Sequence, residues 1–262
     1  MAALLTILAL YVVLAAVLTL AQGRILYPAP TGPGAEPSGF ERITYETSDG
    51  LTLTAGYRPA RGGQPTIVYF HGNGADWQSS VVATDRLVPE GYGVLAAEYR
   101  GYRGNPGSPS EEGLYRDGRA ALAWLAERGV SPQRTVLIGN SIGSGVATRM
   151  AREVQPAALI LISPFSSLTE LAAEKVRWLP TRLLLRDRYD NVAALPEVRS
   201  PVLILHGDAD DLIPPAHARK LAAARPGTEL VIVPSAGHDL AWLPEAEWHA
   251  LAFLERVLGE GP

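Results

Sequence analysis

The chain has 262 residues, of which 47% are hydrophobic, and it carries a formal net charge of −4 with no cysteine. This length can bury one large core, and the missing cysteines exclude a disulfide framework without identifying the compartment. The acidic balance, with a pI near 5.8, argues against a nucleic-acid-binding protein.

The chain opens with an apolar segment. Residues 1–23 contain no charged side chain, and Ala2 to Ala21 is dominated by Ala, Leu, Val and Ile. About 20 such residues form a helix that spans the roughly 30 Å hydrocarbon core of a bilayer. A cleavable signal peptide is the alternative, but its apolar region is usually about 7–15 residues and follows Lys or Arg. We therefore predict a retained single-pass membrane anchor over residues 1–23.

Residues 24–40 are rich in proline and glycine, and we predict that they form an extended tether. A chain that starts near Pro37 is accordingly expected to be soluble and active. Arg24 follows the apolar segment and no basic residue precedes it, which by the positive-inside rule favours a cytoplasmic domain. A single arginine leaves the side of the membrane open.

Residues 41–262 alternate between strand and helix patterns, which predicts one α/β domain with a mostly parallel sheet and helices on both faces. Ser48-Asp49-Gly50 lies between the first two strands and predicts an antiparallel hairpin at the sheet edge. The eight expected strands lie at 43–47, 51–57, 66–70, 93–98, 135–139, 158–162, 201–205 and 229–233. The expected helices lie at 78–90, 110–128, 142–154, 215–224 and 244–258.

A serine stands between two glycines at the expected end of the 135–139 strand, in Gly139-Asn140-Ser141-Ile142-Gly143. This is the layout of a nucleophile elbow, a tight strand-to-helix turn that holds a serine in a strained conformation. Residues two positions before and after the serine would collide with the neighbouring strand and helix unless they lacked a side chain. Ser141 is therefore the candidate nucleophile.

An elbow serine needs an acid and then a histidine later in the chain. The 201–205 strand leads into a loop with three aspartates, Asp208, Asp210 and Asp211, and the 229–233 strand leads into Gly237-His238. His238 is the only one of five histidines on a late loop after the acid. The composition of the acid loop does not separate its three aspartates.

The remaining histidines are assigned other places. His217 and His249 fall in helical patterns and are expected on solvated helix surfaces. His71 and His206 each precede a glycine at a strand end, where an imidazole more often supports the loop through a hydrogen bond.

The segment His206-Gly207-Asp208-Ala209-Asp210-Asp211-Leu212-Ile213-Pro214 resembles the acid loop of the α/β-hydrolases. The resemblance assigns Asp210 as the acid that orients the histidine, with Asp208 in reserve. His71-Gly72-Asn73-Gly74 resembles the loop that donates a backbone N–H to the oxyanion hole in that superfamily. The implied oxyanion donors are the amides of Asn73 and Ile142, and the implied fold is the α/β-hydrolase fold.

Other site classes find no support in the sequence. No Lys-Ser or Lys-Thr follows the glycines as a phosphate loop requires, and no Gly-x-Gly-x-x-Gly opens a helix. No metal-ligand cluster is visible, so we expect neither a metal nor another cofactor.

Residues 163–200 separate two core strands on the side where the nucleophile should lie, and they predict a short cap. Residues 176–185 mix apolar and basic side chains around the helix-breaking Pro180. Two interpretations remain open: ordinary packing of the cap on the core, or contact with acyl chains or with the membrane surface.

Nearly the whole chain resembles the membrane-anchored bud-emergence-protein type of α/β-hydrolase. The resemblance rests on the anchor, the elbow and four further motifs: His71-Gly72-Asn73-Gly74, Tyr99-Arg100-Gly101-Tyr102, Pro109-Ser110-Glu111-Glu112-Gly113-Leu114 and Leu183-Leu184-Leu185-Arg186-Asp187. One departure is the loop 103–107.

This resemblance implies a serine hydrolase that cleaves carboxylic esters or related acyl compounds, lipids among them, through an acyl-enzyme intermediate. The alternatives are a serine aminopeptidase-like peptidase, a membrane acyltransferase and a non-catalytic, membrane-tethered binding scaffold.

Overall fold

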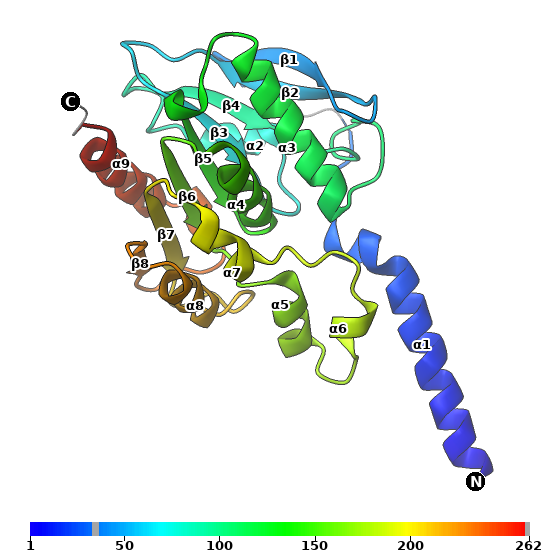
Figure 1. Ribbon diagram of the computed structural model, residues 1–262. Coiled ribbons are helices and arrows are strands. Elements are labelled where there is room, and N and C mark those ends of the chain that lie inside the picture. The colour runs from blue at the N-terminus through cyan, green and yellow to red at the C-terminus, as the bar shows by residue number, and fades with distance from the viewer. Residues whose placement is uncertain (33–36, 260–262) are drawn as a thin grey trace.

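The computed structural model describes residues 1–32 and 37–259. Within these ranges one sheet has the strand order β1-β2-β4-β3-β5-β6-β7-β8 (Figure 1). β2 pairs antiparallel with β1 and with β4, and all other pairs are parallel. The strands are β1 (Glu41–Glu46), β2 (Thr52–Arg58), β3 (Thr66–Phe70), β4 (Gly93–Ala97), β5 (Thr135–Asn140), β6 (Ala158–Ile162), β7 (Val202–Gly207) and β8 (Glu229–Val233). The predicted eight-stranded sheet with an antiparallel edge hairpin is confirmed.

Helices cover both faces of this sheet. One buried cluster joins it to α3, α4 and α8, and a second joins it to α9 and the turns after α2. The helices are α1 (Ala2–Leu26), α2 (Trp77–Val82), α3 (Glu111–Ala126), α4 (Ile142–Val154), α5 (Leu168–Lys175), α6 (Thr181–Leu184), α7 (Asn191–Ala194), α8 (Ala216–Ala224) and α9 (Pro244–Gly259).

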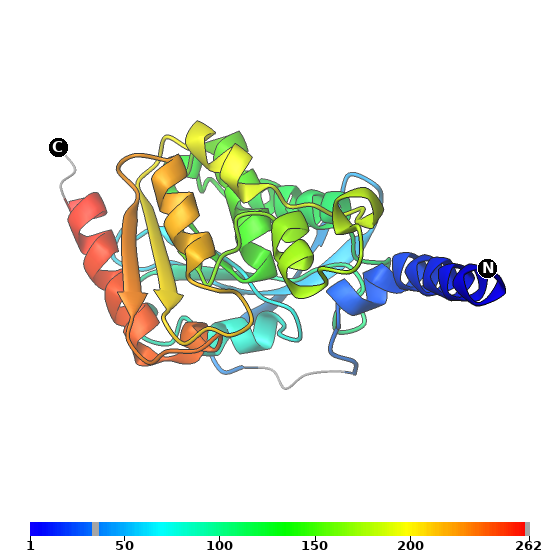
Figure 2. The ribbon, with the colours of Figure 1, turned by 90° about the horizontal axis from the view of Figure 1, so that it is seen from below.

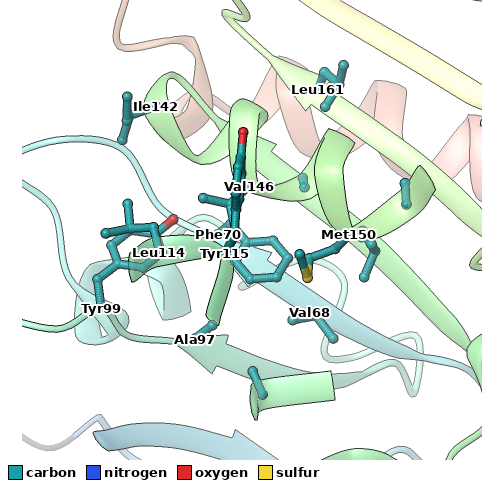
Figure 3. Close-up of a cluster of buried hydrophobic side chains, with 14 of the residues drawn as sticks. Val68, Phe70, Ala97, Tyr99, Leu114, Tyr115, Ile142, Val146, Met150 and Leu161 are labelled. Atoms are coloured by element: carbon teal, nitrogen blue, oxygen red, sulfur yellow. The ribbon is translucent and has the colours of Figure 1, made fainter. Parts of the chain in front are cut away.

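The first cluster supports the turn between β5 and α4. Val146 and Met150 of α4 lie near Phe70 and Val68 of β3 (Figure 3), and Ile142 belongs to the same buried cluster. All five side chains are 3% exposed or less. The first turn of α4 is therefore held against the centre of the sheet by apolar burial.

The predicted helix at 78–90 is wrong in extent. α2 begins at Trp77, after an Asp76–Ser79 capping box, and ends at Val82. Irregular turns follow, in which the Thr84 hydroxyl donates to the carbonyl oxygens of Ser80 and Val81. Such a side-chain bond competes with regular helix hydrogen bonding.

Helix α1 projects from the domain, with the N-terminus at its far end (Figures 1 and 2). It is long and apolar enough to cross a membrane, and it could be a membrane anchor or a signal sequence. Most of its large apolar side chains are exposed.

The segment after α1 differs from the predicted extended tether. The helix continues to Leu26, three residues past the predicted boundary at 23. Tyr27 is then buried, with its hydroxyl 2.8 Å from Asp187 Oδ2 and 3.0 Å from Tyr189 Oη. The Arg103 guanidinium donates to the carbonyl oxygen of Thr31. Residues 27–32 therefore pack on the domain, and residues 33–36 of the predicted tether lie outside the described residues.

The region 163–200 contains two parts. Helices α5 and α6, separated by a turn that ends at Pro180, form the outer part. Helix α7 packs on α4, and Leu195 and Val198 after it belong to the main core. The segment from Leu168 to Leu185 makes up this outer part of the predicted cap.

Candidate active site

Ser141 stands between the last residue of β5 and the first residue of α4, with φ 52° and ψ −117°. This positive φ is strained for a residue with a side chain. A Cβ atom added to Gly143 would lie 2.0 Å from the carbonyl oxygen of Phe70, and one added to Gly139 would lie 2.5 Å from the carbonyl oxygen of Gly143. Both glycines are thus required by the close approach of α4 to the sheet, as their spacing predicts.

The structure brings Ser141, His238 and Asp210 together. His238 Nε2 lies 3.1 Å from Ser141 Oγ, and His238 Nδ1 lies 2.8 Å from Asp210 Oδ2. A carboxylate only accepts hydrogen bonds, so the proton of the neutral imidazole sits on Nδ1 and Nε2 is free to accept from the serine hydroxyl. This is the tautomer that a general base for Ser141 requires.

Asp210 is held as a carboxylate. Burial raises its pKa, but hydrogen bonds from His206, His238 and the Ile213 amide lower the pKa by more than burial raises it. The pKa of Asp210 therefore lies below the ordinary range. Its Oδ1 atom accepts from the amides of Leu212 and Ile213 at 3.0 and 2.8 Å. These donors fix the carboxylate at the position that faces His238.

The other two aspartates of the loop point elsewhere. Asp208 is exposed, and its Oδ1 accepts from the Ser235 amide at 2.6 Å. Asp211 is exposed, and its backbone oxygen accepts from the Lys175 ammonium. Of the three candidates, only Asp210 contacts the histidine.

The loop after β3 lies against the serine. A Cβ atom on Gly72 would be 3.2 Å from Ser141 Cβ, so the two turns are in contact. Asn73 is anchored by its side chain, which donates to the Leu26 carbonyl oxygen at 2.6 Å and accepts from the Tyr102 hydroxyl at 3.1 Å. The Ile142 amide belongs to the first turn of α4, whose N–H groups have no acceptor within the helix.

A buried ion pair beneath this loop was not predicted. His71 Nε2 lies 2.6 Å from Glu98 Oε1, and His71 Nδ1 lies 2.8 Å from the Gly72 carbonyl oxygen. The Gly72 carbonyl oxygen and the Glu98 carboxylate are both acceptors, an arrangement that favours a proton on each ring nitrogen. Burial lowers the pKa of His71, but Glu98 and the Gly72 carbonyl raise it more, and the net pKa lies above the ordinary value.

Glu98 also accepts from the amides of Trp77 and Tyr99, at 3.0 and 2.9 Å. It therefore joins the loop after β3 to the end of β4 and the start of α2. The signal in the sequence was a lone acid at the end of a buried strand, which has no visible partner until the chain folds.

The other three histidines lie in different environments. His206 is buried, lies 2.8 Å from the Ile213 carbonyl oxygen and supports the acid loop, as expected. His249 is exposed, as expected. The prediction for His217 is wrong: it is 3% exposed and lies 2.8 Å from Ser166 Oγ and 3.2 Å from Glu174 Oε2. It joins α8 to the cap.

Among the described residues, no group of three or more His, Cys, Asp or Glu side chains is placed to hold a metal ion. At Ser141 a hydroxyl lies beside an imidazole that can remove the hydroxyl proton as the oxygen attacks an electrophile.

Comparison with known proteins agrees with this architecture. Residues 67–190 match the family model described as "Alpha/beta hydrolase family". The chain is 39% identical over 227 residues to the uncharacterized protein Rv2307c of Mycobacterium tuberculosis, covering 83% of this chain and 80% of the relative. It is 32% identical to the uncharacterized protein YfhR of Salmonella typhi, covering 81% and 79%.

Among solved structures, the Pyrococcus furiosus esterase Pf2001 superposes with a TM-score of 0.73 at 20% identity, covering 88% of this chain and 97% of the esterase. This last similarity is one of fold. With the sheet order, the elbow turn and the sequence matches, it places the chain in the α/β-hydrolase family.

Proposed function

We propose that this α/β-hydrolase is a serine hydrolase that cleaves carboxylic esters or related acyl compounds through an acyl-enzyme intermediate. The observation that carries the proposal is the hydrogen-bonded series from Ser141 Oγ through His238 to Asp210, with separations of 3.1 and 2.8 Å. The fold similarity to a protein that is named an esterase supports the same class of substrate.

In the proposed reaction, Ser141 Oγ attacks the acyl carbon while His238 Nε2 takes the hydroxyl proton. Asp210 stabilises the imidazolium that forms. His238 then returns the proton to the leaving oxygen, and the acyl group remains on Ser141. A water molecule, deprotonated by the same imidazole, releases the acid and restores the serine.

The amides of Asn73 and Ile142 are the proposed oxyanion donors. The Ile142 amide lies at the positive end of α4, which favours a developing negative charge. Asn73 follows the Gly72 contact with Ser141, and its side chain is fixed by Tyr102 and the Leu26 carbonyl. The buried His71–Glu98 pair supports this loop from beneath.

We also propose that the chain is of the membrane-anchored bud-emergence-protein type, with α1 as a retained single-pass anchor and residues 41–262 as the hydrolase domain. The support is the length and apolar composition of α1 and its exposure along the whole apolar window. The natural partners would then be acyl compounds, lipids among them, and the membrane itself.

An activity-based fluorophosphonate probe tests the proposal. Wild-type protein should be labelled at Ser141 and should hydrolyse a series of esters of increasing chain length, whereas Ser141→Ala should do neither. Ser144→Ala is not a matched control, because the Ser144 hydroxyl bonds the Ser141 carbonyl oxygen at 2.6 Å. Ser131→Ala, at an exposed loop position, is a suitable one.

Product analysis separates the rival reactions. Transfer to added alcohol in preference to water would indicate an acyltransferase, and cleavage of peptide amides would indicate a peptidase. Absence of labelling in folded wild-type protein would favour a binding scaffold and overturn the proposal.

A further inference from the structure

The tip of the cap exposes large apolar side chains. Trp178 is 52% exposed and Leu183 is 82% exposed, on either side of Pro180. We use "cap tip" for residues 176–186. Isolated exposed apolar residues are common on soluble proteins, so their neighbours must show whether these have a role.

The cap tip lies along α1 (Figure 1). The Tyr11 hydroxyl donates to the Trp178 carbonyl oxygen at 3.0 Å, and the two rings meet edge to face with centroids 6.3 Å apart. Farther along the helix, Gln22 Oε1 accepts from the Arg186 amide at 2.9 Å. The two contacts on α1 are about 16 Å apart along the helix axis, so the cap tip follows α1 over that distance.

The less exposed residues of α1 form one face. Ala15, Leu18, Thr19 and Gln22 recur at helical spacing and are half-buried or buried, whereas Ala16, Val17 and Leu20 are exposed. Leu18 and Thr19 line a shallow cavity together with Leu179, Thr181 and Leu185 of the cap tip. The contact is thus made by a defined helix face.

The position of this contact limits how α1 can cross a bilayer. Within the helix Ala2–Leu26, the stretch beyond Tyr11 runs from Ala2 to Leu10 and rises about 14 Å. A bilayer core is about 30 Å thick. If the helix Ala2–Leu26 is by itself the membrane span, the stretch that contacts the cap tip crosses about half of the apolar thickness. The cap tip must then lie at or inside the membrane surface.

The charges of this region suit an anionic surface. The cap tip contains three basic side chains and no acidic one, in a chain whose net charge is −4. Arg177 and Arg182 are exposed beside Trp178 and Leu183. Arginine next to tryptophan and leucine is typical of a segment seated among lipid headgroups, with the apolar groups in the acyl region.

We propose that the cap tip is a membrane-binding element, with Trp178 and Leu183 inserted into an anionic phospholipid leaflet beside α1. The proposal rests on the proposed anchor. It places the site next to the bilayer, because Asn73 beside Ser141 bonds Leu26, the last residue of α1. Acyl chains in that leaflet would then reach the site past the cap.

The absence of native cysteine allows single-cysteine labelling of full-length protein whose N-terminus at Met1 has been verified. An environment-sensitive fluorophore is placed on Leu183→Cys, on Leu8→Cys in the outer part of α1, and on Glu127→Cys as the control. Glu127 lies at the end of α3 that is far from the cap tip. The first residue of that helix, Glu111, bonds Asp187 next to the cap tip, and the helix is about 24 Å long. Each protein is reconstituted in phosphatidylcholine vesicles that contain phosphatidylglycerol and doxyl-labelled lipid.

We expect doxyl quenching of the labels at 8 and 183 and none at 127. Quenching at 8 with none at 183 would overturn the membrane-binding cap tip and leave the anchor intact. Loss of quenching at both positions would overturn the anchor as well. Ester hydrolysis of a soluble substrate is measured separately, so the proposed reaction is not confused with either result.

A charge variant tests the choice of lipid. Arg177→Gln/Arg182→Gln in the Leu183→Cys background should reduce quenching at 183 in anionic vesicles, and added salt should reduce it in the parent. Arg199→Gln/Arg219→Gln removes the same charge from exposed positions outside the cap tip and should have no effect. Equal quenching in all three proteins would contradict recognition of anionic headgroups.

Discussion

The loops around Ser141 and the junction of α1 with the cap are held in different ways. At Ser141 the backbone itself is constrained. Ser141 has a positive φ, and a Cβ atom added at Gly139 or Gly143 would overlap a carbonyl oxygen. At the junction, Tyr11 and Gln22 make side-chain contacts from a mostly exposed helix, and Tyr27 makes one directly after it. The first region is fixed by local sterics, whereas the second depends on contacts between distant segments and on the solvent around α1.

The largest expected effect is at the proposed nucleophile and base. Ser141→Ala and His238→Ala should each lower kcat/KM for a soluble ester by about 10³-fold or more. The double variant should lose little beyond either single one, because the two residues act as one unit. Steady-state kinetics on the four proteins measures this. Losses that multiply would contradict a shared proton transfer.

The acid loop offers an internal comparison. Asp210→Asn should lower turnover by about 10²–10⁴-fold, because an amide cannot hold His238 in the required tautomer. Asp208→Asn should have a small effect, since its carboxylate contacts only the Ser235 amide. The same assay on both variants decides, and a larger loss at Asp208 would move the acid to that position.

These positions also show what the sequence could reveal. Ser141 and His238 follow from local spacing, since an elbow and a late histidine loop are contiguous patterns. The choice of Asp210 needed a family resemblance, because three aspartates share one turn and only its folded path directs one inward. The His71–Glu98 pair was missed because 27 residues separate its members.

His217 shows a signal that was present and misread. It is four residues before Leu221 and adjacent to Ala218, and all three are buried, so it lies on the inner face of α8. The docking of Tyr27 had no such signal. The surrounding prolines indicate extended chain in general, and only the position of the cap shows that a tyrosine there is buried.

Two glycines test the contrast in backbone constraint. Gly143→Ala should cost about 3 kcal/mol or more of unfolding free energy, because its Cβ would lie 2.0 Å from the Phe70 carbonyl oxygen in a packed core. Gly23→Ala has no heavy atom within 4 Å of its Cβ and should stabilise α1 by up to about 1 kcal/mol. Denaturant unfolding in detergent measures both. Equal effects would remove the distinction between the regions.

The N-terminal junction is tested by two truncations. The sequence favoured a soluble, active chain from Pro37, but that chain lacks the buried Tyr27. We expect it to be less stable than a chain from Arg24 by about 3 kcal/mol, the usual cost of removing a buried aromatic side chain. Thermal unfolding of both chains checks this. Equal stability would show that the packing of residues 24–32 does not stabilise the domain.

The smallest effect concerns pH and the buried pair beneath the oxyanion loop. The pKa of His71 is raised in the folded state, so its contribution to stability is complete below the unfolded value of about 6.5 and is lost as pH rises through the folded pKa. The groups that face the ring are Glu98, the Gly72 carbonyl, the rings of Tyr99 and Tyr102 and, farther away, Asp76. Wild-type protein should therefore lose unfolding free energy above neutral pH more steeply than Glu98→Gln, which cannot retain the imidazolium. Urea unfolding across a pH series measures the gap in unfolding free energy between wild-type protein and Glu98→Gln. A gap that widens toward high pH would mean that His71 is neutral, and that the loop beside Ser141 is positioned by hydrogen bonds without charge.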